Sequence, residues 1–453
     1  MSKPEQIGII GISHIFIPPV TADLCHEPRL YGTEVLLYDI NQQRSKEAAI
    51  VCTRYAGEIG ADIRFRAVTD LRAAIVDSSF VLQTALAGGR ERGDAIKQAV
   101  AKATGIYGPV EAHAPYAQLK LMLDIADEIQ RLSPDATLIQ CANNPIPEGG
   151  TLVTQETGIR FIGVCHGYKE WEHLARVMGM NPDLAEVKIA GINHNVWLLE
   201  FLYENKDAYP RLDEWIRETS DHWLKTFLPY AKNVDYQLSR AAFDLYRRLG
   251  VMPIGDTTRA SSPNLSCYGY HDSPQAESYF FGNEQGFESV RGESKSRNWR
   301  TKSIEAFAQA AGDPTMRVQH LFPRNSGWQI VPIIASMATD QPSRQMVNVP
   351  NNGAIAGLED RLVVEIPAMV NAQGTHTDGV IQIPPLLFQE ILLPRQKQAL
   401  YHVDAYRLRK EELLLQVLMD NHKIQRDGGG DAASSILNIW KSFDPEMASH
   451  YAI

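Results

Sequence analysis

The sequence has few cysteines, no long basic cluster and no long apolar run, and each absence excludes a class of protein. Its five cysteines are an odd number without a CxxC pair, which argues against a disulfide framework and a structural zinc site. The net charge of −10 makes nucleic acid and anionic membranes poor partners. No apolar run approaches the roughly 20 residues of a membrane-spanning helix. The N-terminal "MSKPEQIGIIG" lacks a signal-peptide layout, so we expect a cytoplasmic protein.

The first 165 residues alternate short apolar runs with segments of helical periodicity. The runs predict buried strands, and the segments between them predict helices. The expected strands are 6–12, 34–39, 78–85, 136–142 and 160–165, and the expected helices are 41–60, 91–103 and 115–132. This alternation predicts an α/β fold with a Rossmann-like, doubly wound parallel sheet, in which ligands bind beyond the carboxyl ends of the strands.

The pattern changes after residue 165, which predicts a second, α+β domain. We expect two strands joined by "NHN" within 186–205, a buried helix at 329–340, and a strand, loop and strand within 345–371. Residues 210–250 and 384–422 are expected to be helical, and 255–300 to form loops around a site. The predicted domains are 1–190 for nucleotide binding and 191–453 for substrate, metal and oligomerisation.

The stretch "IGIIGISHIF" followed by "VLLYD" is the first motif with a chemical meaning. A strand that ends at Gly11 permits a tight turn, and a helix beginning near Pro18 or Pro19 would present backbone N–H groups to a pyrophosphate. Asp39, at the end of the second strand, can accept hydrogen bonds from adenosine ribose hydroxyls. An acid at this position favours NAD over NADP.

The glycine fingerprint of dinucleotide-binding folds is incomplete. Ser13 and Phe16 stand where G-x-G-x-x-G has its second and third glycines. Serine is the nearest substitute for a close backbone approach, whereas Phe16 is a clear departure. The candidate cofactor-binding residues are Gly11, Ser13, Asp39 and Thr84, the last near the end of the expected strand 78–85. The alternative is a strand–turn–helix unit that binds no nucleotide.

Cys165 in "GVCHGY" and His194 in "GINHN" each follow an apolar strand. A thiolate and an imidazole could share a divalent metal, with water or substrate oxygens completing an open, catalytic coordination sphere. The alternative is a buried cysteine and a strand-end histidine that hydrogen bonds to the backbone. His166 is a polar neighbour of Cys165 rather than a third ligand.

Taken together, these motifs resemble glycoside hydrolase family 4, the NAD- and metal-dependent glycosidases, over nearly the whole chain. The family is an exception to the two-carboxylate rule of glycoside hydrolysis. "CHG" and "GVMPIGDT" look like the branch that acts on unphosphorylated α-glycosides such as α-glucosides and α-glucuronides. The resemblance rests on "LYDIN", "NNP", "GVCHG", "GINHN", "YRRLGVMPIGDT" and "NVPNNGAIAGLEDRLVVEIPAMVNAQG" in the family's order.

The resemblance implies a role for each motif residue. Cys165 and His194 would hold the metal, usually Mn(II), and Asp256 would be the base that removes a proton, supported by Glu111. The implied substrate-binding residues are Asn144, His166 and Arg259. Either Arg90 or Arg92 could be the family's further arginine; the local spacing leaves the choice open. The resemblance also implies a homodimer or homotetramer.

The resemblance implies hydrolysis by oxidation and elimination. NAD⁺ takes hydride from sugar carbon 3, the metal stabilises charge while the proton on carbon 2 is removed, the aglycone leaves, water adds and the hydride returns. The alternative is a hydroxy-acid dehydrogenase of the lactate/malate type, with His194 as its acid/base. A further alternative is a nucleotide-sensing or scaffold protein without catalysis, which the incomplete glycine motif permits.

Overall fold

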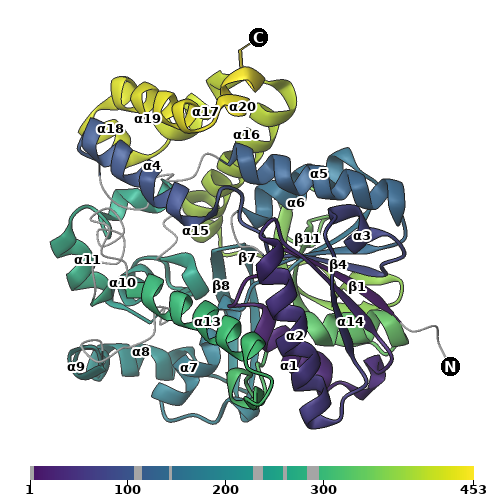
Figure 1. Ribbon diagram of the computed structural model, residues 1–453. Coiled ribbons are helices and arrows are strands. Elements are labelled where there is room, and N and C mark those ends of the chain that lie inside the picture. Colours follow the sequence, from purple (N-terminus) through teal and green to yellow (C-terminus); the bar gives the residue numbers. More distant parts are fainter. Residues whose placement is uncertain are drawn as a thin grey trace.

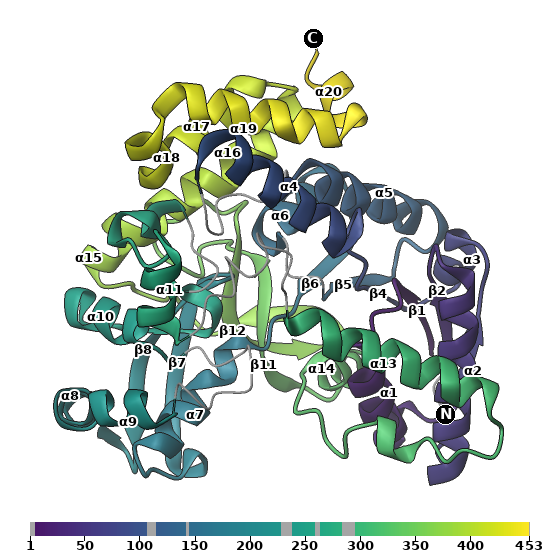
Figure 2. The ribbon, with the colours of Figure 1, turned by 60° about the vertical axis from the view of Figure 1, so that its left-hand side comes forward.

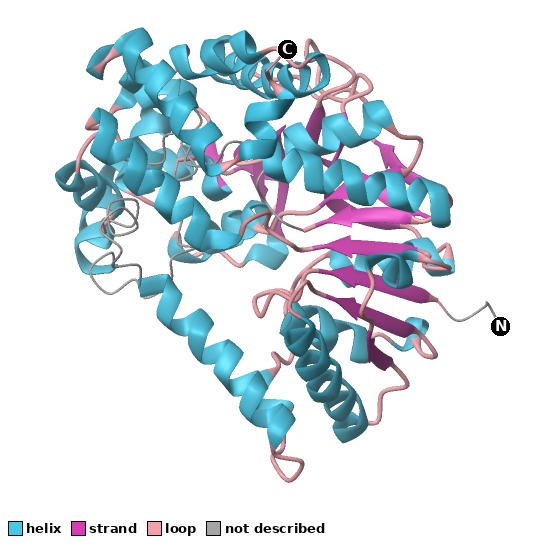
Figure 3. Cartoon of the chain, turned by 45° about the horizontal axis from the view of Figure 1, so that its top comes forward, coloured by secondary structure: helices cyan, strands magenta, loops and turns pink. Residues whose placement is uncertain are grey.

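A computed structural model describes residues 5–106, 115–141, 145–227, 238–258, 263–282 and 295–452. Its strands form one mixed sheet in the order β10-β8-β7-β12-β11-β6-β5-β4-β1-β2-β3, with β9 and β13 paired at the sides. Helices cover both faces of the strands (Figure 3). The α/β class and the Rossmann-like sheet with a second part are therefore confirmed.

The N-terminal half of the sheet is parallel. All pairings among its six strands are parallel, and the central strands β1, β4 and β5 are buried along nearly their whole length. Continuous burial explains why these strands appear in the sequence as unbroken apolar runs. The strands are β1 (Gln6–Ile10), β2 (Glu34–Tyr38), β3 (Arg64–Ala67), β4 (Phe80–Gln83), β5 (Thr137–Gln140) and β6 (Arg160–Gly163).

The second half of the sheet is antiparallel and joins the first without a break. The pair Asn348↔Gly163 connects β11 to β6, and Glu365↔Gly191 connects β12 to β7. The strands joined by "NHN" are present as the β7–β8 pair, as predicted. The strands are β7 (Ala185–Ile192), β8 (Asn195–Tyr203), β9 (Lys206–Asp207), β10 (Met252–Ile254), β11 (Ser343–Pro350), β12 (Val363–Asn371) and β13 (Gly374–Thr377).

The helices between β1 and β6 connect the parallel strands, and α7 follows β6. The predicted helices 41–60, 91–103 and 115–132 are confirmed within two residues. The helices are α1 (Ile17–Cys25), α2 (Gln42–Ile59), α3 (Leu71–Ile75), α4 (Gly89–Thr104), α5 (Tyr116–Leu132), α6 (Ile146–Glu156) and α7 (Glu170–Val177). Strand β3 and helix α3 were not predicted, because β3 is a short edge strand with charged residues and α3 has only five residues.

The C-terminal helices form a layer above α4 and α5 (Figure 1), where α19 packs against α4. The helices after α7 are α8 (Tyr209–Glu218), α9 (Ser220–Phe227), α10 (Arg240–Leu249), α11 (Pro274–Phe281), α13 (Lys295–Gly312), α14 (Ile330–Thr339), α15 (Pro385–Leu387), α16 (Leu393–Leu408), α17 (Glu411–Met419), α18 (His422–Asp427), α19 (Gly429–Phe443) and α20 (Pro445–His450). Within the described ranges, no helix is long and apolar enough to cross a bilayer.

The expectation of loops throughout 255–300 is wrong, because α11 and the start of α13 are helical. Helix α13 lies along α2 (Figure 2), and the two helices are in contact. Among its residues with described side chains, only Phe307 and Ala310 are buried. Such a narrow apolar face produces no clear helical period in the sequence.

Candidate active site

Three candidate residues meet at the carboxyl edge of the sheet. Cys165 follows β6, His194 lies in the turn between β7 and β8, and Asp256 follows β10. The imidazole Nε2 of His194 lies 3.6 Å from Asp256 Oδ2, with side-chain exposures of 18% and 33%. Burial lowers the pKa of His194, and the Asp256 carboxylate opposes that shift. The site therefore holds a neutral imidazole against a solvent-accessible carboxylate.

A contact between two glycines sets the position of Asp256 relative to Cys165. Gly255 has φ +65°, and a Cβ there would lie 3.0 Å from the carbonyl carbon of Gly167. A Cβ on Gly167 would in turn lie 3.0 Å from Gly255 Cα and 3.7 Å from the Cys165 sulfur. Glu170 Oε2 accepts the Gly255 N–H at 3.1 Å. Two side-chain-free positions thus let the loops after β6 and β10 touch.

A buried carboxyl group, Glu365 on β12, lies beneath the turn that carries His194. Asn193 Nδ2 donates to Glu365 Oε2 at 2.7 Å, and Glu365 is 1% exposed. Burial raises the pKa of Glu365 to about 7, although hydrogen bonds from Asn193 and Asn348 oppose the shift. Glu365 was not among the predicted site residues. Its signal is a single acid inside the apolar run "VVEIPAMV", a position that an unpaired carboxylate rarely occupies.

Cys165 is 4% exposed, and burial raises the pKa of its thiol, with the Glu365 and Asp256 carboxylates adding to the effect. His194 Nε2 is buried and has no hydrogen-bond partner within the described residues, so this nitrogen can serve as a ligand to a cation. A thiolate and a free imidazole nitrogen fit a divalent metal as two of its ligands. The described part of the chain contains no group of three His, Cys, Asp or Glu that could hold a metal, so further ligands must come from elsewhere.

His166 packs parallel to Trp328, with ring centroids 4.2 Å apart and an angle of 18° between the rings. Burial lowers its pKa to about 3, and Lys169 adds to the shift, so the ring is neutral. Both ring nitrogens are buried without a partner among the described residues. Phe16, in the turn between β1 and α1, contacts the same Trp328, edge to face, with ring centroids 5.3 Å apart. Trp328 therefore connects that turn with the segment after Cys165.

The predicted cofactor residues gather where β1, β2 and β4 end. Gly11 has φ +88°, and a Cβ there would lie 2.5 Å from the Ala85 nitrogen, so the turn requires glycine. The Thr84 hydroxyl donates to the Gly11 carbonyl. Asp39 accepts the N–H of Ile12 at 2.7 Å and of Asn41 at 2.8 Å. These side chains therefore build the turn itself.

The expectation that α1 presents free N–H groups is wrong. The helix begins at Ile17, and the N–H groups of Phe16 and Ile17 both donate to the Ser13 carbonyl, at 2.9 and 2.8 Å. Pro18 and Pro19 have no N–H group. The first turn of α1 is thus left without a backbone donor for an anion.

Several predicted residues lie outside the described residues or away from this edge. Glu111, Asn144 and Arg259 lie outside the described residues. Of the two alternative arginines, Arg92 pairs with Asp444 at 2.8 Å and donates to the Phe443 carbonyl at 2.9 Å. Arg92 therefore anchors the C-terminal helices.

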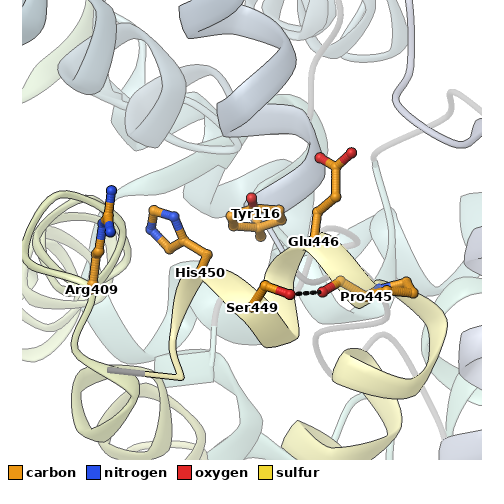
Figure 4. A pocket seen from close by; sticks show the side chains of 6 residues that line it. All are labelled: Tyr116, Arg409, Pro445, Glu446, Ser449 and His450. Carbon is orange, nitrogen blue, oxygen red and sulfur yellow. Dashed lines mark hydrogen bonds between the residues drawn. The ribbon is translucent and has the colours of Figure 1, made fainter.

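A pocket near the C-terminus is separate from the candidate site (Figure 4). Tyr116 and His450 lie next to each other in it, between Arg409 and Glu446, and Ser449 Oγ donates to the Pro445 carbonyl at 3.0 Å. None of its lining residues is a predicted site residue.

Two models of the same protein family match consecutive parts of the chain. The model named "Family 4 glycosyl hydrolase" matches residues 6–180, and the model of the "Family 4 glycosyl hydrolase C-terminal domain" matches 189–424. An alpha-galactosidase of Bacillus subtilis (strain 168) is 24% identical, over 98% of each chain.

Two solved structures share the fold. That of lplD from Bacillus subtilis has a TM-score of 0.79 at 19% identity, covering 96% of this chain and 99% of that one. A 6-phospho-alpha-glucosidase from gut microorganisms, in complex with NAD and Mn²⁺, has a TM-score of 0.77 at 16% identity and covers 98% and 99%. With both family models matching in order across the same residues that form the sheet and the site, the chain belongs to family 4 of the glycosyl hydrolases.

Proposed function

We propose that this protein hydrolyses unphosphorylated α-glycosides, of α-glucoside or α-glucuronide type, with NAD and Mn(II) or another divalent metal bound at the carboxyl edge of the sheet. The observation that supports this most directly is the meeting of Cys165, His194 and Asp256 from three separate strand ends. In the family structure that contains NAD and Mn²⁺, the fold is shared over nearly the whole chain.

Each residue has a distinct role in this proposal. When bound, the nicotinamide would exchange hydride with sugar carbon 3 and the metal would stabilise negative charge on the oxygens of carbons 2 and 3. Cys165 and His194 would hold the metal. Asp256 would take the proton from carbon 2, because its carboxylate is accessible and a Gly–Gly contact fixes the loop that carries it.

The remaining candidates would orient the sugar. His166 offers two unpartnered ring nitrogens from a ring held against Trp328, which suits hydrogen bonding to sugar hydroxyls. Asn144, Arg259 and Glu111 are proposed from their motifs as substrate contacts and as support for the base. Gly11, Ser13, Asp39 and Thr84 would form the nucleotide end, with Arg90 as the further arginine near the sugar.

We also propose a cytoplasmic homodimer or homotetramer, in which 1–190 binds nucleotide and 191–453 binds substrate.

A substrate panel tests this function. Nitrophenyl α-glucosides, α-galactosides and α-glucuronides, each also as the 6-phosphate where it exists, would be assayed with NAD⁺, Mn(II) and reductant. We expect release of nitrophenol from unphosphorylated sugars, and loss of activity on chelation. A clear preference for the 6-phosphates would contradict the substrate class while leaving the family chemistry intact.

Isotope exchange separates this proposal from a lactate/malate-type dehydrogenase. A glycosidase of the proposed kind exchanges the carbon-2 proton with deuterium from solvent and produces no net NADH. A dehydrogenase produces NADH in proportion to the product and leaves that proton in place. Stoichiometric NADH would therefore overturn the proposed mechanism.

A further inference from the structure

His14 is a buried histidine in the turn between β1 and α1 without an evident structural partner. The residue is 9% exposed, and its Nε2 has no hydrogen-bond partner among the described residues. The ring stands edge-on to Phe307 of α13, with centroids 5.0 Å apart and an angle of 90°. A polar ring atom buried in this way is costly unless something binds to it.

The backbone donors around His14 are already used within the turn. Ile12 N–H donates to Asp39, Ser13 N–H to the Gly11 carbonyl at 3.2 Å, and Ile15 N–H reaches Ser13 Oγ at 3.4 Å. The N–H groups at the start of α1 are also satisfied or missing, as described above. The His14 N–H has no partner within the described residues. Among the backbone groups of residues 12–15, the His14 N–H is therefore the one left to donate to a phosphate.

Burial favours a neutral His14 ring. Burial lowers the pKa of His14 to about 4, with Arg44 adding to the effect and Asp39 opposing it. A neutral imidazole still carries one N–H, which can donate to a phosphate oxygen. Arg44 Nη1 lies 3.8 Å from Asp39 Oδ2. The positive and negative charges near His14, at the carboxyl ends of β1 and β2, therefore offset each other.

Helix α13 fixes the direction of the ring. Phe307 contacts both His14 and Phe322, the latter with centroids 5.8 Å apart. Arg54 of α2 donates to the carbonyls of Ala310 and Asp313 at the end of α13, at 2.7 and 2.9 Å. A ring held between two elements can present its N–H without a loss of rotamer freedom on binding.

We propose that His14 binds the pyrophosphate of the dinucleotide, supplying through its ring and its backbone N–H the donors that a glycine-rich turn and a helix N-terminus otherwise provide. This inference rests on the proposed function, since it needs a dinucleotide at this edge. It accounts for a nucleotide-binding turn in which serine and phenylalanine replace two glycines.

Direct binding of nucleotide fragments tests the role of His14. Titration calorimetry of the whole chain would measure NAD⁺, ADP-ribose and adenosine with the wild type, His14→Phe and His14→Gln. Phenylalanine keeps the ring against Phe307 but has no donor, whereas glutamine keeps an amide donor. We expect His14→Phe to weaken NAD⁺ and ADP-ribose by about 10- to 100-fold, the effect of a lost hydrogen bond to a charged group. Adenosine binding should stay within about twofold, and His14→Gln should stay closer to the wild type than His14→Phe.

The outcomes separate this inference from the proposed function. A wild type that binds none of the three ligands overturns both. A wild type that binds NAD⁺, with a folded His14→Phe that binds ADP-ribose equally well, overturns the role of His14 alone.

A measurement on the wild type does not depend on whether the variants fold. In protein labelled with ¹⁵N at histidine, ADP-ribose should shift the ring resonances of His14 and adenosine should leave them in place. Equal responses to the two ligands would contradict a contact with the pyrophosphate.

Discussion

Asp256 is the residue on which the proposed proton transfer depends. Its side chain is one-third exposed and 3.6 Å from His194 Nε2, so replacement should alter chemistry more than stability. We expect Asp256→Asn to lower kcat by about 100- to 10,000-fold, the usual contribution of a positioned base. Carbon-2 deuterium exchange should fall by the same factor, because the same group removes that proton.

Asp221→Asn, at an exposed position in the first turn of α9, is the control for a lost surface carboxylate. It should leave both rates unchanged. An Asp256→Asn enzyme that keeps normal exchange would show that another group is the base.

The contact between Gly167 and Gly255 predicts that two similar glycines respond differently to the same change. Gly255 and Gly250 both have positive φ, +65° and +71°, so alanine at either position costs about 1–2 kcal/mol of backbone strain. Only at Gly255 would the new Cβ meet backbone, at 3.0 Å from Gly167; at Gly250 nothing lies within 4 Å. Gly255→Ala should therefore reduce activity by moving Asp256 away from Cys165.

Gly250→Ala should lower only the melting temperature. Thermal unfolding and glycosidase activity, measured side by side for the two variants, check this difference. Equal activities for the two variants would mean that the Gly–Gly contact does not set the site.

Glu365 predicts a pH dependence of stability in the metal-free protein. Its folded pKa is about 7, raised by burial, and lies above the unfolded value of about 4.3. Between these values unfolding releases a proton, so the free energy of unfolding falls as pH rises from about 4.5 to 7. The contribution is up to about 4 kcal/mol, because one pKa unit corresponds to about 1.4 kcal/mol.

Glutamine at this position keeps an oxygen for Asn193 but cannot ionise. In urea unfolding at pH 5 and pH 8, Glu365→Gln should therefore lose less stability than the wild type between the two values. Parallel pH profiles for the two proteins would contradict a buried, titrating carboxyl.

At the scale of elements, Arg54 of α2 joins the two halves of the chain. Its Nη1 donates to the carbonyls of Ala310, Asp313 and Met316, so a cation meets the C-terminal end of α13. Arg54→Ala should destabilise the protein by about 1–3 kcal/mol and raise hydrogen exchange in 301–312. Arg64→Ala, at an exposed position on the edge strand β3, is the control and should change neither. Unchanged exchange in α13 would show that its apolar face alone holds it.

The elements that the sequence predicts best are those whose burial is uniform. Strands β1, β4 and β5 are buried on both faces and appear as apolar runs, whereas α13 buries too narrow a face to be recognised. Motif positions placed Cys165, His194 and Asp256 at strand ends that the structure brings together. Glu365 was missed because its importance comes from Asn193, a partner far away in the sequence. Likewise, the sequence could not show that the N–H groups of Phe16 and Ile17 donate to Ser13, because those hydrogen bonds form only in the folded turn.

At the scale of the whole molecule, the two segments matched by the family models, 6–180 and 189–424, share one sheet and one core. β11 pairs with β6, the Val363 N–H donates to Thr151 Oγ1 at 2.9 Å, and Gly150 packs against Phe161 and Val363. The largest apolar cluster includes residues from Ile7 to Leu400. The predicted boundary near residue 190 therefore does not divide the packing of the chain.

A shared core predicts cooperative unfolding of the two segments. Hydrogen exchange in increasing urea should give the same midpoint for peptides covering β2 and β8, which lie in the segments 6–180 and 189–424, respectively.

A fragment of residues 1–180 should be insoluble or partly folded, because β6 would lose its pairing with β11 and expose an apolar edge. Two separate midpoints, or a fragment that is soluble and folded, would show that each segment is stable alone and that their shared strands only dock. The midpoint of the β8 peptides should also rise with NAD⁺, because a ligand that binds one segment stabilises every part that unfolds with it.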